Sequence, residues 1–279
     1  MQVFKIISLG LVGLALYLPL PAKAEPPKRV VSINVCTDQL AMLLAGEDQL
    51  YSVSHLARDP RTSAMSLDAE RFRVNFGQVE EVFLMRPDLV LAGAYTAQAT
   101  VNLLRQFDIP VEIFTPSTGV DAIPEKIRQM GVALGRDAAA ETLVEDFAQR
   151  LDALRDAVKD RPRAALYFAN GYTTGDQTLA GQILVAAGFT NIAHEAGVAS
   201  GGTLPLEILA LSEPDFVVTS EKYPGSSRSE SILDHPVVRK MSDDIAAGAV
   251  SDQDWICGTP YVLRAIAELA DVRTELEVP

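Results

Sequence analysis

Short apolar runs rich in β-branched residues alternate along the first half of the chain with segments whose apolar residues lie three or four positions apart. The first pattern is typical of buried strands, and the second of helices that bury one face. The predicted strands are 29–35, 50–54, 88–92 and 111–114, and the predicted helices are 37–45, a short helix ending near residue 86, and 96–107. This alternation predicts an α/β fold with a mostly parallel sheet flanked by helices.

The second half repeats this order of elements and also repeats one local motif. Strands are predicted at 163–170 and 215–219, with a helix at 179–187 between them. Glu80 stands seven residues before a Pro-Asp pair, and Glu207 stands seven residues before another. The apolar residues between Glu and Pro keep helical spacing in both copies, so we predict two lobes of similar construction.

A third pattern lies between the halves, where apolar residues at intervals of three and four define one face of a long helix over 137–160. They are Ala140, Leu143, Val144, Phe147, Leu151, Leu154 and Val158. At about 1.5 Å per residue such a helix spans roughly 36 Å, the height of a small domain. We therefore predict an N-terminal lobe at 25–136, a stiff linking helix at 137–161 and a C-terminal lobe at 162–279, with only modest closure of the lobes.

The N-terminus has the pattern of a secretory signal. Lys5 precedes an apolar run over 6–18, and Ala-Lys-Ala follows at 22–24. The apolar run is shorter than the roughly 20 residues that a spanning helix needs, which argues against the alternative of a membrane anchor. We predict a signal peptide at 1–24, cleavage after Ala24 and a periplasmic protein.

The charge balance restricts the partners. The chain has 24 basic and 37 acidic residues, a formal net charge of −13. Binding to phosphate backbones requires clustered Lys and Arg, so we expect no nucleic-acid partner. Much of the acidity can simply favour solubility.

Signatures of catalysis are scarce. The sequence has no Gly-rich phosphate loop, no dinucleotide fingerprint and no H-E-x-x-H. The segment Gly-Tyr-Thr-Thr-Gly at 171–175 has Thr where a nucleophile elbow needs Ser. The three histidines, His55, His194 and His235, have no metal-ligand spacing to one another. We expect a protein that is not an enzyme and has no metal site or cofactor of its own.

Polar and aromatic residues follow the ends of several predicted strands, the edge where parallel α/β sheets bind ligands. Large rings with polar tips suit a bulky amphipathic ligand. The candidate ligand-binding residues are Cys36, His55, Arg58, Asp59, Tyr95, Asn170, Tyr172, Thr173, Tyr223, Trp255 and Tyr261. Arg58 could pair with an anionic chelate or form a salt bridge with Asp59. Each tyrosine could instead serve local packing, and Trp255 could be buried beneath the last helix.

Several segments, in this order and spacing, resemble the iron-siderophore and cobalamin periplasmic binding proteins of ABC importers. They are RVVSINVCTDQLAMLLAG, GQVEEVFLMRPDLVLAG, the long linking helix and DWICGTPYVLRAIAEL. The resemblance implies two α/β lobes joined by a rigid helix, with a ferric siderophore, cobalamin or haem in the groove between them. It also implies delivery to an ABC permease and its ATPase, and we expect a monomer.

The same resemblance assigns a role to the repeated glutamates. By position, Glu80 and Glu207 look like the surface glutamates, one per lobe, that dock onto permease arginines. The alternative is that each merely favours its helix N-terminus through the macrodipole. Two other classes of protein also remain as alternatives, a periplasmic α/β hydrolase and a metallochaperone or sensor on the same fold.

The two cysteines depart from any general rule of that family. Cys36 and Cys257 both precede predicted helices, the second through Thr259 as an N-cap and Pro260 at the first helical position. Both sulfurs should therefore lie near the groove, in opposite lobes. In an oxidising compartment the pair could form one disulfide, or remain as two free thiols that act on the ligand.

Overall fold

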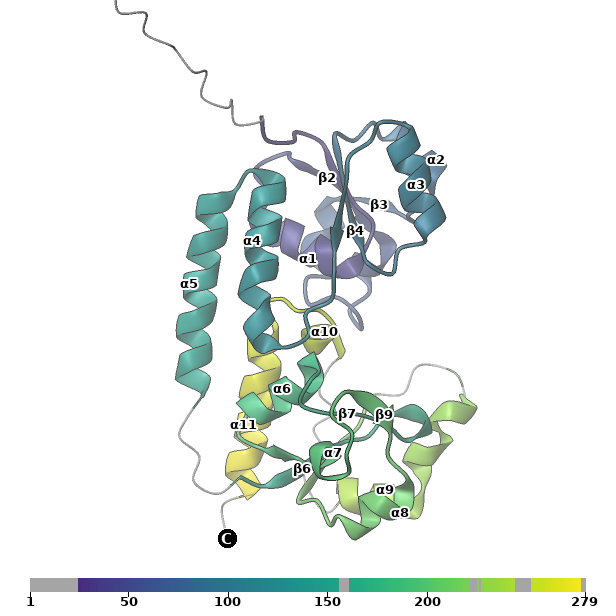
Figure 1. The fold of residues 1–279 in the computed structure, drawn as a ribbon, viewed down its shortest axis with the longest axis vertical. Coiled ribbons are helices and arrows are strands. Elements are labelled where there is room, and N and C mark those ends of the chain that lie inside the picture. Colours follow the sequence, from purple (N-terminus) through teal and green to yellow (C-terminus); the bar gives the residue numbers. More distant parts are fainter. Residues whose placement is uncertain (1–24, 156–160, 221–224, 226, 244–251, 277–279) are drawn as a thin grey trace, which may run out of the picture.

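The computed structural model describes residues 25–155, 161–220, 225, 227–243 and 252–276. Two lobes lie one above the other, and the helices α4 (Ile123–Leu134) and α5 (Asp137–Leu154) run along one side of the molecule (Figure 1). The predicted signal peptide lies outside the described residues. Within the described ranges, no helix is both long and apolar enough to span a membrane.

The N-terminal lobe is built on a five-stranded, fully parallel sheet in the order β3-β2-β1-β4-β5. Its strands are β1 (Val30–Ser32), β2 (Leu50–Ser54), β3 (Arg73–Asn75), β4 (Leu89–Gly93) and β5 (Val111–Phe114). Its other helices are α1 (Val35–Leu44), α2 (Val79–Leu84) and α3 (Gln98–Gln106), with 3₁₀ turns at His55–Arg58, Asp68–Arg71 and Val120–Ala122.

Both faces of this sheet are buried, which explains why its strands are almost continuously apolar. Val31 and Val90 pack with residues of α2 and α3 on one face. Their neighbours Val30 and Leu91 point to the other face, into the cluster that includes α1 and α4. Successive side chains of a strand point to opposite sides, so one apolar run serves both layers.

The C-terminal lobe has a three-stranded parallel sheet in the order β10-β6-β8 and an antiparallel pair, β7 and β9. Its strands are β6 (Arg163–Leu166), β7 (Tyr172–Thr174), β8 (Thr190–Asn191), β9 (Gly201–Thr203) and β10 (Phe216–Val218). Its helices are α6 (Leu179–Ala186), α7 (Ile192–Glu195), α8 (Leu206–Leu211), α9 (Pro236–Asp243), α10 (Asp252–Trp255) and α11 (Val262–Leu276), with 3₁₀ turns at Ala169–Gly171 and Arg228–Asp234. The predicted α/β class, with parallel sheets flanked by helices, is confirmed.

The helix over 137–160 differs from its prediction in length and in setting. It has 18 residues and ends at Leu154, because Arg155 leaves the helical conformation with φ −82° and ψ 66°. Residues 156–160 of the predicted helix lie outside the described residues. It also pairs with α4, which was not predicted. Gly135 joins the two helices at φ 66°, a left-handed conformation that favours glycine.

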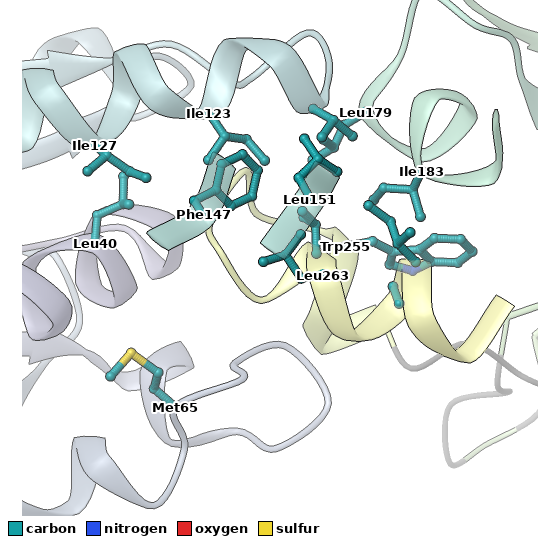
Figure 2. Close-up of a cluster of buried hydrophobic side chains, with 14 of the residues drawn as sticks. Leu40, Met65, Ile123, Ile127, Phe147, Leu151, Leu179, Ile183, Trp255 and Leu263 are labelled. Carbon is teal, nitrogen blue, oxygen red and sulfur yellow. The ribbon is translucent and has the colours of Figure 1, made fainter. Parts of the chain in front are cut away.

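The two lobes share one hydrophobic core. A single cluster of buried residues includes Leu40 of α1, Ile127 of α4, Phe147 of α5 and Leu263 of α11. Figure 2 shows these side chains together with Leu151, Leu179, Ile183 and Trp255 along the contact between the lobes. Burial of this kind stabilises by roughly 25 cal/mol per Å² of apolar surface, so the lobes support one another.

A matching set of hydrogen bonds, here called the clamp, holds the turn between a helix and the following strand in each lobe. In the first lobe the Asp88 carboxylate accepts hydrogen bonds from the backbone N–H groups of Lys28 at 2.7 Å and Arg29 at 2.9 Å. The Arg29 guanidinium donates to the carbonyl of Met85 at the end of α2. The turn between helix and strand passes through Arg86, which has a positive φ of 51°.

The second lobe repeats this clamp. Asp215 accepts from the backbone N–H of Arg163 at 2.7 Å, and the Arg163 guanidinium donates to the carbonyl of Ser212 at the end of α8. Glu213 occupies the turn with a positive φ of 44°. The motif repeated in the sequence is therefore also repeated in three dimensions.

Candidate ligand-binding site

A cavity of about 480 Å³ lies between the lobes, at the carboxyl ends of β1, β4 and β5. Its N-terminal-lobe wall is formed by Asn34, Cys36, Thr37, Leu40, Gly93, Ala94, Tyr95, Phe114, Thr115, Pro116, Ser117 and Lys126. The opposite wall is formed by Tyr172, Thr174, Thr178, Leu179, Ala180, Trp255, Ile256 and Gly258. Ligands of open α/β sheets bind at this edge, where the strands end and the helices begin.

The start of α1 shapes one wall. The Asn34 side chain caps this helix by accepting hydrogen bonds from the backbone N–H groups of Cys36 at 3.0 Å and Thr37 at 3.4 Å. Gly93 at the end of β4 lies directly beside this cap. A Cβ atom at residue 93 would come within 2.8 Å of the Asn34 amide nitrogen, so the close approach requires glycine.

The opposite wall begins at the N-terminus of α6. Thr178 caps this helix by accepting from the N–H of Gly181. Trp255 is 6% exposed and packs edge-on against Phe168, with 6.2 Å between ring centroids. Trp255 therefore combines the two roles weighed for it, because it is buried and also lines the cavity.

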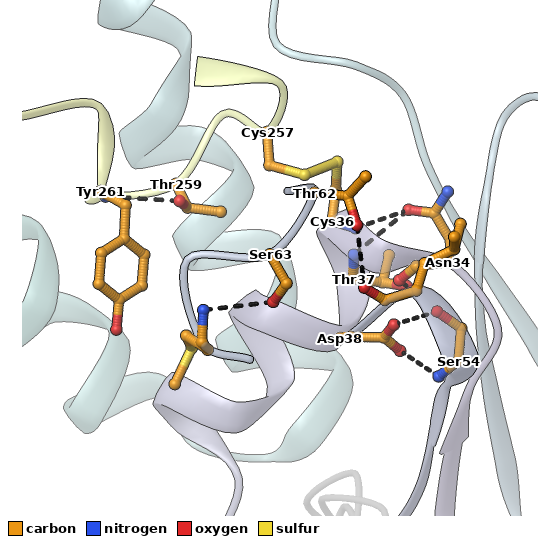
Figure 3. Close-up of a disulfide and its surroundings, with 12 residues drawn as sticks. Asn34, Cys36, Thr37, Asp38, Ser54, Thr62, Ser63, Cys257, Thr259 and Tyr261 are labelled. Atoms are coloured by element: carbon orange, nitrogen blue, oxygen red, sulfur yellow. Dashed lines mark hydrogen bonds between the residues drawn. A yellow bond between two sulfur atoms is a disulfide. The ribbon is translucent and has the colours of Figure 1, made fainter. Parts of the chain in front are cut away.

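A disulfide between Cys36 and Cys257 joins the two lobes at the cavity wall, with Cα atoms 5.1 Å apart (Figure 3). Of the two alternatives for these cysteines, the structure has the disulfide. The expected helix starts need correction. Cys36 lies inside the first turn of α1, and α11 begins at Val262 because a preceding turn, in which Thr259 accepts from the N–H of Tyr261, delays the helix.

Asp38 is a fully buried acid just behind this wall. Its carboxylate accepts from the Ser54 backbone N–H at 3.1 Å and from the Ser54 hydroxyl at 2.5 Å (Figure 3). Burial raises the pKa of Asp38 from 3.8 to about 7, although both hydrogen bonds from Ser54 favour the charged form. Sequence reasoning missed this residue, because Asp38 lies between two other polar residues, Thr37 and Gln39, at the start of the helix.

The predicted ligand-binding residues divide into two groups. Cys36, Tyr95, Tyr172 and Trp255 line the cavity. The structure places His55, Arg58, Asp59, Asn170, Thr173 and Tyr261 outside its lining. Tyr223 lies outside the described residues.

Arg58 and its neighbours serve the loop in which they lie. The Arg58 guanidinium donates to the backbone carbonyls of Ala69, Glu70 and Phe72, and it does not form the salt bridge with Asp59 that was the alternative. Asp59 instead pairs with Arg61, whose hydrogen bonds hold the pKa of the Asp59 carboxyl well below its usual range. His55 stacks on Phe76 with 4.9 Å between ring centroids.

Of the other three predicted residues outside the cavity lining, two contact neighbouring protein groups and one lies in an exposed turn. The Thr173 hydroxyl donates to the carbonyl of Leu166 at 2.6 Å and faces away from the cavity. Tyr261 packs beneath the Arg264 guanidinium, 4.7 Å from its ring centroid. Asn170 is exposed and has a left-handed φ of 58°.

Glu80 and Glu207 occupy equivalent places on the repeated motif. Each is the second residue of a short helix, α2 or α8, and each side chain is exposed. The clamps at Asp88 and Asp215 fix the ends of these two helices in the same way.

The fold and the cavity together define a two-lobed α/β protein with a cavity between its lobes. Residues 30–246 match the family model described as periplasmic binding protein. The chain therefore belongs to the periplasmic binding protein family. The family and the solved neighbours are binding proteins and not enzymes, as predicted.

Two known proteins are similar to this chain in sequence. The chain is 33% identical over 198 residues to the cobalamin-binding protein of Halobacterium salinarum, covering 69% of this chain and 54% of that protein. The chain thus spans about half the length of that relative. It is 23% identical over 270 residues to an uncharacterized ABC transporter substrate-binding lipoprotein, YvrC, of Bacillus subtilis, covering 88% of this chain and 80% of that protein.

Solved structures share the fold. The periplasmic heme-binding protein RhuT from Roseiflexus sp. RS-1, in apo form, has a TM-score of 0.73 at 21% identity and covers 89% of this chain and 98% of its own. The periplasmic vitamin B12 binding protein BtuF of Vibrio cholerae has a TM-score of 0.65 at 19% identity, covering 91% and 99%.

Proposed function

We propose that this protein captures a ferric siderophore, cobalamin or similar metal chelate between its lobes and delivers it to the permease of an ABC importer. The observation that carries the proposal is the interlobe cavity, whose walls include the rings of Tyr95, Tyr172, Phe114 and Trp255. Aromatic and aliphatic walls with a few polar groups suit a bulky ligand with large apolar faces. The relative named as a cobalamin-binding protein supports this class of ligand.

Delivery would use the repeated glutamates. Glu80 and Glu207 are exposed, one on each lobe, at matching positions of the repeated motif. Two carboxylates presented in this way fit two arginines of a permease, as charge-assisted pairs. The permease would work with its ATPase, and the predicted signal peptide would place the binding protein in the periplasm.

Ligand capture can be tested by fluorescence, because Trp255 is the single tryptophan of the chain. The mature protein is titrated with ferric siderophores of several classes, cobalamin and haem. A bound chelate that absorbs in the near ultraviolet or visible should quench Trp255 strongly and saturably, since this residue lines the cavity. If no chelate binds, the proposed function is wrong; tight binding without quenching would place the ligand elsewhere.

Delivery is tested separately. The double variant Glu80→Ala/Glu207→Ala should abolish uptake of the bound chelate while its affinity for that chelate stays unchanged. The control variant is Glu145→Ala/Glu275→Ala, which removes two exposed acids from α5 and α11. Unchanged uptake by the first variant, or equal loss in both, would contradict the docking role.

A further inference from the structure

The charge of the cavity is concentrated at one point. Among the described residues that line it, Lys126 is the single one with a full formal charge. The Lys126 ammonium donates to the Thr115 hydroxyl at 2.8 Å, which uses one of its three hydrogens. No described carboxylate forms an ion pair with it, although the chain as a whole has a net charge of −13.

The opposite wall includes a buried hydroxyl without a partner and the start of a helix. Thr174 is 8% exposed, and its hydroxyl has no hydrogen-bond partner within the described part of the chain. The N-cap Thr178 and the first two residues of α6, Leu179 and Ala180, also line the cavity, and the first N–H groups of a helix carry partial positive charge. The backbone N–H of Val120 donates to Gln182 of α6 at 2.8 Å, which holds the turn before α4 against this helix.

The remainder of the lining is neutral and largely apolar, with Leu40, Phe114, Leu179, Trp255 and Ile256 among its members. One cation in such a cavity can neutralise one acidic group of a ligand. It cannot neutralise a chelate whose several negative charges surround the metal, because each further charge would be desolvated without a partner. The lining therefore suits a ligand with apolar faces and a localised acidic group at its edge.

We propose that Lys126, which lines the same cavity as Thr174 and the N-terminus of α6, binds an acidic group on the rim of a metal-containing macrocycle. This inference rests on the proposed function and narrows its ligand to a corrinoid with a phosphate group or a tetrapyrrole with carboxylates. Both ligands share a large flat ring and a peripheral anion. A charge-assisted hydrogen bond from the lysine would hold the anion and set the orientation of the ring.

The test uses ligand pairs that differ only in their peripheral acidic groups, one phosphate in the first pair and two carboxylates in the second. Cobinamide phosphate is compared with cobinamide, and haem with haem dimethyl ester, by equilibrium dialysis against wild-type protein and Lys126→Met. In at least one pair the wild type should bind the acidic member about tenfold more tightly than the neutral member. Lys126→Met should lose that tenfold preference and keep its affinity for the neutral member.

Two further variants make the result specific. Lys126→Arg keeps the charge and should retain most of the preference. Lys28→Met removes an exposed lysine that pairs with Glu25, and it should leave both affinities unchanged. The thermal transition of each variant confirms that it folds.

The possible failures are distinguishable. If the wild type binds none of the chelates, the proposed function fails and this inference fails with it. If the wild type binds a chelate but Lys126→Met weakens both members of a pair equally, or neither, Lys126 does not bind the rim and this inference alone is wrong. Preferential binding of a trianionic ferric catecholate siderophore would also overturn it, while leaving the proposed function intact.

Discussion

Replacing Asp38 by Asn should change how the stability of the protein depends on pH. Asp38 is completely buried, and burial raises its pKa from 3.8 to about 7. Asn has the same shape and cannot ionise. Its amide oxygen can accept from the Ser54 N–H, while its NH₂ group donates to the Ser54 hydroxyl, so the local structure should be retained.

The direction of the pH dependence follows from the number of protons bound in the folded and unfolded states. With its raised pKa, Asp38 keeps a proton in the folded protein at pH values where the unfolded chain has lost it. The free energy of unfolding therefore falls as pH rises from about 4 to about 7. Between pH 4.5 and pH 8 the loss is about 3 kcal/mol, since one pKa unit corresponds to about 1.4 kcal/mol. Asp38→Asn removes this loss, so the stability of the variant relative to wild type should increase by about 3 kcal/mol over that interval.

Urea unfolding of both proteins at several pH values, followed by Trp255 fluorescence and circular dichroism, measures this difference. Asp152→Asn, at an exposed position of α5, controls for the removal of one acid. If the free energies of unfolding of Asp38→Asn and wild type differ by the same amount at every pH, the reasoning is refuted. If the free energy of unfolding of Asp38→Asn relative to wild type instead falls as pH rises, Ser54 and the N-terminus of α1 keep the carboxylate ionised.

Three more perturbations test other parts of the structure. Cys36→Ala/Cys257→Ala should lower the free energy of unfolding by up to about 5 kcal/mol, since the disulfide closes a sequence separation of 221 residues, and an unchanged urea midpoint would contradict this. Arg58→Met should lower the free energy of unfolding by about 1 to 2 kcal/mol, because three hydrogen bonds to backbone carbonyls are lost, and it should leave chelate affinity unchanged. A large loss of affinity would show that Arg58 contacts the ligand. Gly93→Ala should weaken the cap of α1 and lower the melting temperature, a cost of about 1 kcal/mol or more, and calorimetry that finds no change would show that Asn34 can move aside.

The elements that sequence reasoning found are those with long apolar patterns. The strands over 50–54, 88–92 and 111–114 are present, because both faces of the sheet require continuous apolar runs. The strands β3, β7, β8 and β9 were missed, because two or three residues such as Thr190 and Asn191 are too few to form a pattern. The helix α4 could have been predicted, since Ile123, Ile127, Met130 and Leu134 have helical spacing and are fully buried.

The site was less predictable, because it depends on side-chain direction within short elements. Thr173 and Thr174 are neighbours on β7, yet the first hydroxyl bonds to the carbonyl of Leu166 and the second residue lines the cavity. Successive residues of a strand point to opposite sides, and the phase of a three-residue strand is not determined by its own sequence. Lys126 was missed for a related reason, since its place at the cavity depends on the unpredicted α4.

The hydrophobic cluster shared by the lobes limits how such a protein can be recombined. Phe147 and Leu151 of α5 pack in the same cluster as Ile183 and Leu263, which belong to the other half of the chain. A gene fragment that ends after α5 would expose these side chains to water, and its product should aggregate. A chimaera that exchanges a whole lobe with another family member would therefore have to exchange α5, α6 and α11 together. Grafting the cavity loops alone would leave this packed unit intact.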